Sequence, residues 1–267
     1  MHPRSQLASL GVHAKKRFGQ NFLTSPHWAQ TLVERLLEQK DPVAVWEIGP
    51  GLGALTDGLL KRSPVPPRLF EIDRNLCAYL RERFPEIDLV EGDFLKWEPS
   101  EPLEKVLVLG NLPYNVSSPI FFKLLDWKES ILRMVLTFQR EFARRLVAKP
   151  MTPDYGGTSV VAQTFYELHS LGVIPPGAFY PKPEVDSEAI CFEPKPDPQI
   201  DRDAFLKLVR ESFSHRRKML LKNLSHTYGK EKLNAVFEAL QISPKARAEE
   251  LAPAQFLELA EKLLGSN

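Results

Sequence analysis

Short apolar runs alternate with helical patterns of hydrophobic residues between Pro42 and Phe138. Each apolar run is bounded by polar or glycine-rich positions, and the intervening helical patterns include the one through Leu55, Leu59 and Leu60. The predicted strands are residues 43–48, 68–72, 87–90, 106–109 and 134–138. Alternation of this kind is typical of βαβ units, so we expect an α/β fold whose largely parallel sheet has helices on both faces.

Two further patterns extend this core. Ser25 and Pro26 predict the N-cap and first turn of a helix that precedes the sheet. Residues 171–174 and 188–192 are expected to form a closing hairpin at one edge of the sheet. Both elements would complete the unit that begins with the alternating segments.

Pro194, Pro196 and Pro198 interrupt a polar stretch, which predicts a linker. Beyond it the hydrophobic pattern is wholly helical. We therefore expect two domains, residues 1–198 with the sheet and residues 199–267 as a small all-helical domain.

Charge is distributed unevenly, although the net charge of the 267 residues is only +1. Residues 1–33 carry +4 net, and residues 200–247 hold eleven Lys and Arg against five Asp and Glu. The segments outside these two carry an excess of acid. Two basic ends are typical of a protein that binds a polyanion, but solvated lysine-bearing helices would give the same pattern.

Several classes of protein are disfavoured by composition. No apolar run approaches the roughly 20 residues that span a bilayer, and the first residues lack the apolar core of a secretion signal. Cys77 and Cys191 stand apart, which favours a reducing compartment, and the six histidines show no ligand spacing. We expect a cytoplasmic, monomeric protein without a metal site.

A glycine-rich segment, from Glu47 through Gly49, Gly51 and Gly53, directly follows the first predicted strand. Glycines at a strand-to-helix turn let the backbone approach a ligand closely. The second strand ends at Glu71, which can accept hydrogen bonds from ribose hydroxyls. This much fits nicotinamide dehydrogenases as well as methyltransferases.

Two acids favour S-adenosylmethionine as the cofactor. Glu47 stands just before the first glycine, where its carboxylate could attract the cationic methionine portion directly or through water. Asp93 follows the third strand, where it can accept from the adenine amino group. Acids at three successive strand ends disfavour a purely structural turn.

The segment Asn111-Leu112-Pro113-Tyr114 follows the fourth strand and indicates a target site. An exocyclic adenine amine is a poor nucleophile, because its lone pair is delocalised into the ring. The side-chain oxygen of Asn111 and the backbone carbonyl of Pro113 can hold its two N–H groups and favour a pyramidal nitrogen. Rate then comes from alignment and electrostatics without a strong base. Tyr114 can stack on an extruded base.

With these motifs the chain resembles the ribosomal RNA adenine dimethylase family, in its bacterial small-subunit branch, over nearly its full length. Further matching segments are residues 16–23, residues 179–187 ending in Val-Asp-Ser, residues 215–218 and residues 247–249. The resemblance implies a Rossmann-like class I methyltransferase sheet and N6,N6-dimethylation of adenosines, two of them adjacent, in small-subunit ribosomal RNA or the immature small subunit. Tyr180 and Lys182 depart from the family pattern within their segment.

The resemblance also assigns residues to roles. It implies that Phe179 faces Tyr114 across the target adenine, and that Leu112 belongs to the catalytic segment. Contacts with the cofactor are implied for Asn21, Leu23, Gly49, Glu71, Asp93 and Asn111.

Three basic clusters are the candidates for RNA phosphates. The helix expected to start near Gln139 carries one of them, which could instead be a solvated face. A second lies at residues 15–17, and the third, at residues 216–218, could instead cap a helix or pair with acids. The candidates are Lys15, Lys16 and Arg17; Arg140, Arg144 and Arg145; and Arg216, Arg217 and Lys218.

Three rival functions remain at this point. A family relative that methylates large-subunit RNA would tend to have Ile at the position of Leu112. A non-catalytic RNA-binding assembly factor on the same fold is disfavoured by the intact Asn111, Pro113 and Tyr114. A nicotinamide dehydrogenase is disfavoured because no catalytic His or Tyr-Lys arrangement is evident. Asp186-Ser187 has no GxSxG elbow that would support a hydrolase.

Overall fold

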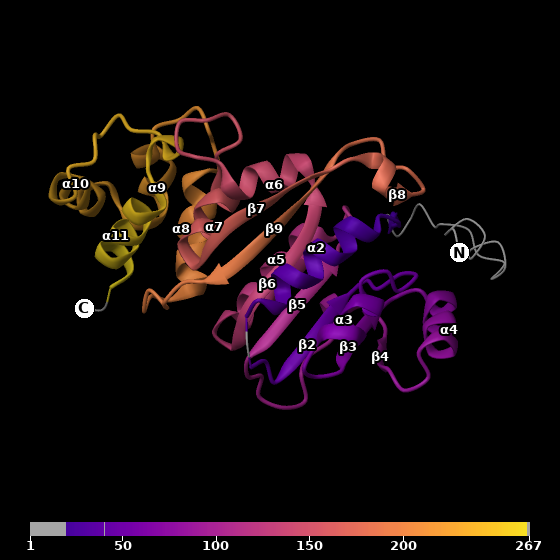
Figure 1. Cartoon of the computed structure of the whole chain (residues 1–267). Coiled ribbons are helices and arrows are strands. Elements are labelled where there is room, and N and C mark those ends of the chain that lie inside the picture. The colour runs from indigo at the N-terminus through magenta and orange to yellow at the C-terminus, as the bar shows by residue number, and fades with distance from the viewer. Residues whose placement is uncertain (1–19, 40, 266–267) are drawn as a thin grey trace. The chain divides into compact units, whose positions relative to one another are not determined.

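The apolar runs form a seven-stranded sheet in the computed structural model, which describes residues 20–39 and 41–265 (Figure 1). The strand order is β4-β3-β2-β5-β6-β9-β7. The strands are β2 (Ala44–Ile48), β3 (Pro67–Glu71), β4 (Asp88–Glu91), β5 (Val106–Asn111), β6 (Ile131–Gln139), β7 (Tyr166–Ile174) and β9 (Ser187–Pro194).

The sheet is mostly parallel, as the alternation predicted. β2 pairs in parallel with β3 and β5, β3 with β4, and β5 with β6, whereas β9 runs antiparallel to β6. The five predicted strands are all present, and β9 and β7 close one edge where a hairpin was expected. The prediction of a Rossmann-like α/β sheet is confirmed.

Helices cover both faces of this sheet. The helices of this part of the chain are α2 (Pro26–Leu37), α3 (Thr56–Arg62), α4 (Arg74–Arg83) and α5 (Ser117–Asp126). The next helix, α6 (Arg140–Val147), begins directly after β6. Ser25 caps α2 as predicted, because its hydroxyl accepts from the N–H of Trp28 at 3.4 Å. On the face shared with α2 and α3, the core includes Val45, Leu107 and Val135.

An aromatic cluster fills the opposite face. Trp46 is 2% exposed and meets Phe70, Trp97 and Trp127 edge-on, with ring centroids 5.3 to 5.7 Å apart. Alternation along β2 places Trp46 opposite to Val45. The prediction that Trp46 belongs to the core is confirmed.

A second, two-stranded sheet was not predicted. β1 (Phe22–Leu23) pairs antiparallel with β8 (Phe179–Tyr180), and Leu23 lies opposite Phe179. The N–H of Thr24 donates to the carbonyl of Ala178 at 2.8 Å and extends the pairing. This short ladder fixes the path of residues 20–23.

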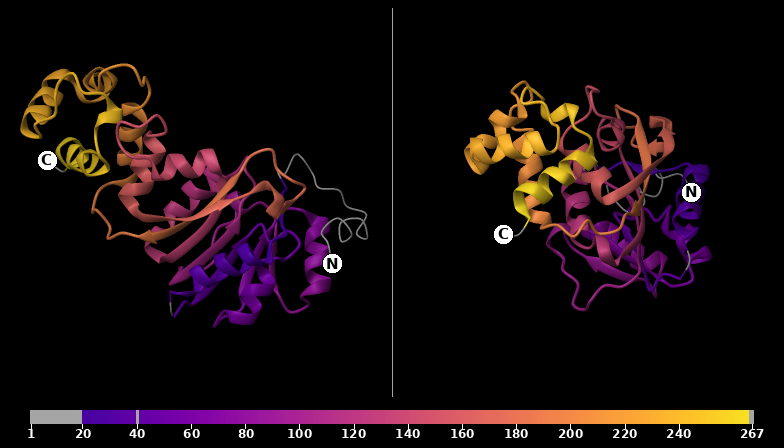
Figure 2. Two further views of the ribbon diagram at one scale, coloured as in Figure 1. Left: turned by 45° about the horizontal axis from the view of Figure 1, so that its top comes forward. Right: turned by 90° about the vertical axis from the view of Figure 1, so that its left-hand side faces the viewer.

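The described residues divide into two compact units. One comprises residues 20–39, 41–143 and 169–194, and the other comprises residues 144–168 and 195–265. The second unit is helical, and its last three helices appear in yellow tones in Figures 1 and 2. Its helices are α7 (Gly157–Phe165), α8 (Arg202–Ser212), α9 (Leu220–Tyr228), α10 (Lys230–Ala239) and α11 (Pro253–Leu264). The sequence placed residues 144–168 with the sheet domain; in the structure they join the helical unit, because α7 packs on α8 and α11.

None of the helices within residues 20–39 and 41–265 is both long enough and apolar enough to cross a membrane.

Candidate active site

The strand order reverses between β2 and β5. From β2 the chain proceeds outward through β3 and β4, and it then returns to β5 on the other side of β2. Open α/β sheets bind ligands outside the carboxyl ends of their strands at such a point. A cavity of about 180 Å³ lies there, and nine of the ten residues predicted to be catalytic or to bind the cofactor line it. They are Asn21, Leu23, Gly49, Glu71, Asp93, Asn111, Leu112, Pro113 and Tyr114.

The turn after β2 requires glycine at two positions of the cavity wall. Gly49 has φ 70° and Gly51 has φ 58°, both in the left-handed region. A Cβ at Gly51 would also lie 2.8 Å from the Cδ1 atom of Phe22. Glycine at these two positions therefore lets the backbone adopt this turn and approach a ligand closely.

Glu71, at the end of β3, is 6% exposed and accepts two backbone hydrogen bonds. The donors are the N–H groups of Gly51 at 3.2 Å and Asp73 at 2.9 Å. Burial nevertheless outweighs these bonds and raises the pKa of Glu71 to about 7. The carboxylate is thus held in a fixed orientation, and its charge is sensitive to pH near neutrality.

Two neighbours complete the same side of the cavity. Asp93 is partly buried and caps a short 3-10 helix, η2 (Phe94–Lys96), by accepting from the N–H of Leu95 at 3.0 Å. Ile72 is 43% exposed although it is apolar, and it lines the cavity beside Glu71. Sequence patterns missed Ile72, whose only signal was an apolar residue directly after a strand-ending acid. We call Gly49, Glu71 and Asp93, with Ile72, the acidic half of the cavity.

Glu47 does not belong to this half. It is fully buried, does not line the cavity and accepts a hydrogen bond from the Thr56 hydroxyl at 2.7 Å. Burial raises its pKa to about 8. Of the two interactions considered for Glu47, direct or through water, this position does not favour the direct one, because the side chain bonds Thr56 at the start of α3 and does not line the cavity.

The last residue of β5 and the residues that follow it form the opposite side, which we call the neutral half: Asn111, Pro113 and Tyr114. The Nδ2 of Asn111 donates to the backbone carbonyl of Asn21 at 2.9 Å, so its Oδ1 is left to accept. The carbonyl of Pro113 accepts from the N–H of Val116 at 3.1 Å and has a second lone pair. Two neutral acceptors therefore lie two residues apart at the carboxyl end of β5.

Phe179 is the predicted residue that the structure does not bring to the cavity. It is 4% exposed and packs in the core cluster that also contains Leu23 and Val135. The pairing of β8 with β1 places Phe179 in this cluster. The expected arrangement, with Phe179 facing Tyr114 across a base, stays a prediction.

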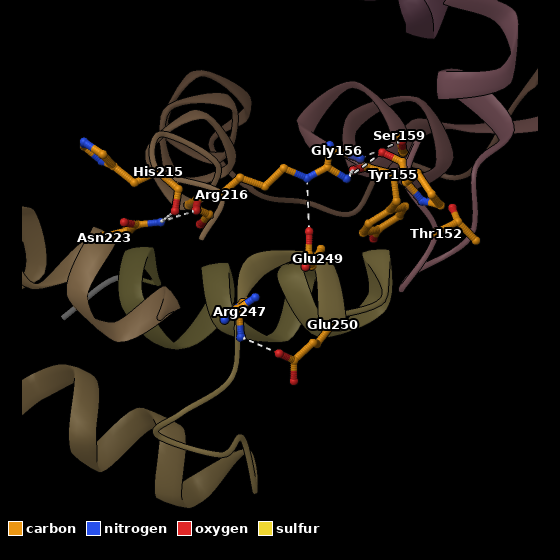
Figure 3. Close-up of polar contacts among 12 residues, drawn as sticks. Thr152, Tyr155, Gly156, Ser159, His215, Arg216, Asn223, Arg247, Glu249 and Glu250 are labelled. Carbon is orange, nitrogen blue, oxygen red and sulfur yellow. Dashed lines mark hydrogen bonds and ion pairs between the residues drawn. The ribbon is translucent and has the colours of Figure 1, made fainter. Parts of the chain in front are cut away.

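Two of the predicted basic residues, Arg140 and Arg216, form ion pairs with acids. Arg140 forms an ion pair with the Asp186 carboxylate at 3.0 Å. Arg216 pairs with Glu249 at 3.0 Å and donates to the carbonyls of Pro153 and Tyr155, as Figure 3 shows for Glu249 and Tyr155. These contacts favour the alternative that such cations are structural.

The other predicted basic positions in the described part of the chain lie on its surface. Arg144 and Arg145 are exposed near the end of α6, and Arg217 and Lys218 are exposed just before α9. Lys15, Lys16 and Arg17 lie outside the described residues.

A family model described as ribosomal RNA adenine dimethylase matches residues 11–264. The chain belongs to this family. The resemblance drawn from the motifs is thus confirmed, as is the prediction of a methyltransferase, and a nicotinamide dehydrogenase is excluded.

Individual proteins are similar to this chain over nearly its full length. "Ribosomal RNA small subunit methyltransferase A" of Chlorobaculum parvum is 41% identical over 256 residues, which span 94% of this chain and 90% of that protein. The protein of the same name from Bordetella avium is 38% identical over 259 residues, spanning 95% and 96%.

Two solved structures share the fold of this family member. A dimethyladenosine transferase from Plasmodium falciparum has a TM-score of 0.78 at 25% identity, covering 89% of this chain and 95% of that one. The 23S rRNA methyltransferase ErmE has a TM-score of 0.68 at 27% identity, covering 91% and 99%.

Proposed function

We propose that this chain transfers methyl groups from S-adenosylmethionine to the exocyclic amines of two adjacent adenosines in small-subunit ribosomal RNA, giving N6,N6-dimethyladenosine. The observation that carries the proposal is the fixed amide of Asn111 at the switch point of the sheet. Its Oδ1 and the Pro113 carbonyl are the two acceptors that an adenine amine needs. Family membership and the names of the relatives support the same substrate.

The acidic half suits S-adenosylmethionine. The Glu71 carboxylate is oriented by two N–H donors and can accept from ribose hydroxyls, while Asp93 can accept from the adenine amino group. Ile72 offers an apolar surface to a flat ring. Gly49 lets the backbone approach without a side chain in the way. When bound, the cofactor supplies an electrophilic methyl group.

Catalysis in the neutral half follows from position. Asn111 and Pro113 each accept one N–H of the target amine, which turns the nitrogen lone pair toward the methyl group. These acceptors bind most strongly as positive charge develops on the nitrogen, so they act chiefly in the transition state. Tyr114 packs against the extruded base. The proton leaves to solvent after methyl transfer, without a positioned strong base.

The small subunit is favoured over the large subunit as the substrate. The small-subunit methyltransferases of Chlorobaculum parvum and Bordetella avium are 41% and 38% identical to this chain over more than nine-tenths of its length. Leu112 also differs from the Ile that large-subunit enzymes tend to have. We further propose that the chain acts as a cytoplasmic monomer, and that the exposed Arg144, Arg145, Arg217 and Lys218 bind RNA phosphates.

The test is transfer of tritium-labelled methyl groups to unmethylated small subunits and, in parallel, to large subunits. We expect label in the small subunit alone, and mass spectrometry of the digested RNA should find dimethyladenosine. Label in the large subunit would support the rival relative instead. Absence of label from both, with RNA binding intact, would support a non-catalytic assembly factor.

A further inference from the structure

The structure contains a hydrogen bond at the cavity that the proposed chemistry does not use. The Tyr114 hydroxyl and the Ser187 Oγ lie 2.6 Å apart, although 73 residues separate them in sequence. Tyr114 follows β5 and Ser187 begins β9, and β6 lies between these strands in the sheet. The Tyr114 phenol therefore extends across the end of β6 and forms a hydrogen bond with the first residue of β9.

Ser187 is held rigidly. Its side chain is fully buried, and its Cα is paired with that of Gln139 at the end of β6. Asp186 fixes the preceding position, because its backbone carbonyl accepts from the Arg140 N–H at 3.0 Å and its carboxylate pairs with the Arg140 guanidinium. The serine hydroxyl thus has little freedom to move relative to the sheet.

Tyr114 is also held at its backbone end. The Ser117 hydroxyl donates to the Tyr114 carbonyl at 3.1 Å, and Ser117 is buried in the first turn of α5. The phenol oxygen and the backbone carbonyl of Tyr114 are thus both hydrogen-bonded to buried serines where the residue lines the cavity.

We propose that Ser187 is a positioning residue for adenine methylation, whose hydroxyl holds the phenol of Tyr114 so that the ring presents one fixed face to the target base. The proposal rests on the proposed function. It assigns the phenol oxygen the role of an anchor rather than a proton acceptor. Burial raises the pKa of Tyr114, which agrees with a phenol that stays protonated.

Three variants of the full chain test this role: Ser187→Ala, Tyr114→Phe and the double variant. Single-turnover transfer is measured on unmethylated small subunits at saturating S-adenosylmethionine. Each single variant should be slowed about fivefold, the typical effect of losing one net hydrogen bond. Because both remove the same bond, the double variant should be no slower than Tyr114→Phe. Cofactor affinity should not change in Ser187→Ala, since Ser187 does not line the cavity.

Ser63→Ala is the matched control. It also removes a hydrogen-bonded serine hydroxyl, which here donates to the Val65 carbonyl at 2.6 Å instead of bonding a side chain. Ser63 lies between α3 and the beginning of β3, at the opposite end of the strands. Its transfer rate should equal that of the unaltered chain.

Two results would overturn the role of Ser187. One is an unchanged rate in Tyr114→Phe, a variant that keeps Ser187 and the aromatic ring, so the test does not depend on the folding of Ser187→Ala. The other is a Ser187→Ala effect that persists in the Tyr114→Phe background, which would show a structural role. Failure of the unaltered chain to methylate the small subunit would overturn the proposed function instead.

Discussion

The acidic half of the cavity has carboxylates at the ends of β3 and β4, whereas the acceptors of the neutral half, Asn111 and Pro113, do not ionise between pH 6 and 9. Glu71 is buried with a pKa raised to about 7, and Asn111 is held by a hydrogen bond to the Asn21 backbone. The difference indicates a division of labour. The acidic half should determine how tightly the cofactor binds, and the neutral half should determine how fast the methyl group is transferred.

Removing the Asn111 amide should have the largest effect, and this effect should be on the transfer rate. Asn111→Ala loses an acceptor that acts in the transition state, so the single-turnover rate at saturating cofactor should fall about a hundred- to a thousandfold, by analogy with oxyanion donors. RNA affinity should change far less. Asn111→Asp keeps an acceptor and should retain part of the rate. A rate for Asn111→Ala within about threefold of the unaltered chain would contradict the assignment.

Removing the Glu71 carboxylate should lower cofactor affinity and leave the transfer rate nearly unchanged. Glu71→Ala should weaken S-adenosylmethionine binding by about 1–3 kcal/mol, measured by calorimetry, because ribose hydroxyls lose their acceptor. Its saturated transfer rate should stay near that of the unaltered chain. Glu91→Ala is the matched control: Glu91 is the register partner of Glu71 on β4 but does not line the cavity. Equal affinities in the two variants would remove Glu71 from the site.

Cofactor affinity should also depend on pH through Glu71. Ribose hydroxyls donate to the ionised carboxylate, so binding favours the deprotonated form and lowers the pKa from its value of about 7. Affinity should therefore be full above this pKa and fall below it, by up to about tenfold per pH unit. Titrations between pH 6 and 8 measure this dependence, and Glu71→Gln should abolish it. A pH-dependent affinity that survives in Glu71→Gln would assign the titration to another group.

The smallest effects are expected from the basic surface. Neutralising Arg217 and Lys218 to Gln should lower the slope of log RNA affinity against log salt by about 0.7–0.9 for each phosphate that the variant no longer binds. Arg216→Gln should instead lower the unfolding temperature, because it removes the Glu249 ion pair and two hydrogen bonds to backbone carbonyls.

A matched pair of exposed lysines provides the control for this slope. Lys207 on α8 and Lys230 on α10 are exposed and lie outside the predicted RNA-binding clusters. Neutralising both should leave the slope unchanged. A slope that is the same in the two double variants would make Arg217 and Lys218 ordinary surface residues.

Local patterns in the sequence were sufficient to predict most of the sheet and the cavity. Strand periodicity located β2 to β6, and the order of motifs at successive strand ends placed Gly49, Glu71, Asp93 and Asn111 around one cavity. This succeeded because the carboxyl ends of parallel strands share one edge of a sheet. The location of these four residues could be predicted without knowing which distant segments contact each other.

Features that depend on tertiary pairing were not predicted. Phe179 lies in the core because β8 pairs with β1. Each of these strands has only two residues and is too short to show a periodic pattern. Arg216 pairs with Glu249 from a distant segment, and Glu47 is directed toward Thr56 rather than a ligand. The Tyr114–Ser187 bond likewise depends on the order of β5, β6 and β9.

Catalysis in the neutral half is proposed to depend on position and not on a titrating base, and a pH profile tests this most directly. Single-turnover methyl transfer would be measured from pH 6 to 9 with RNA and S-adenosylmethionine both saturating, so that the ionisation of Glu71 does not limit binding. We predict a flat profile. A rate that rises about tenfold per pH unit toward a plateau would show that an ionised base takes the proton in the rate-limiting step, and would contradict the proposed catalysis.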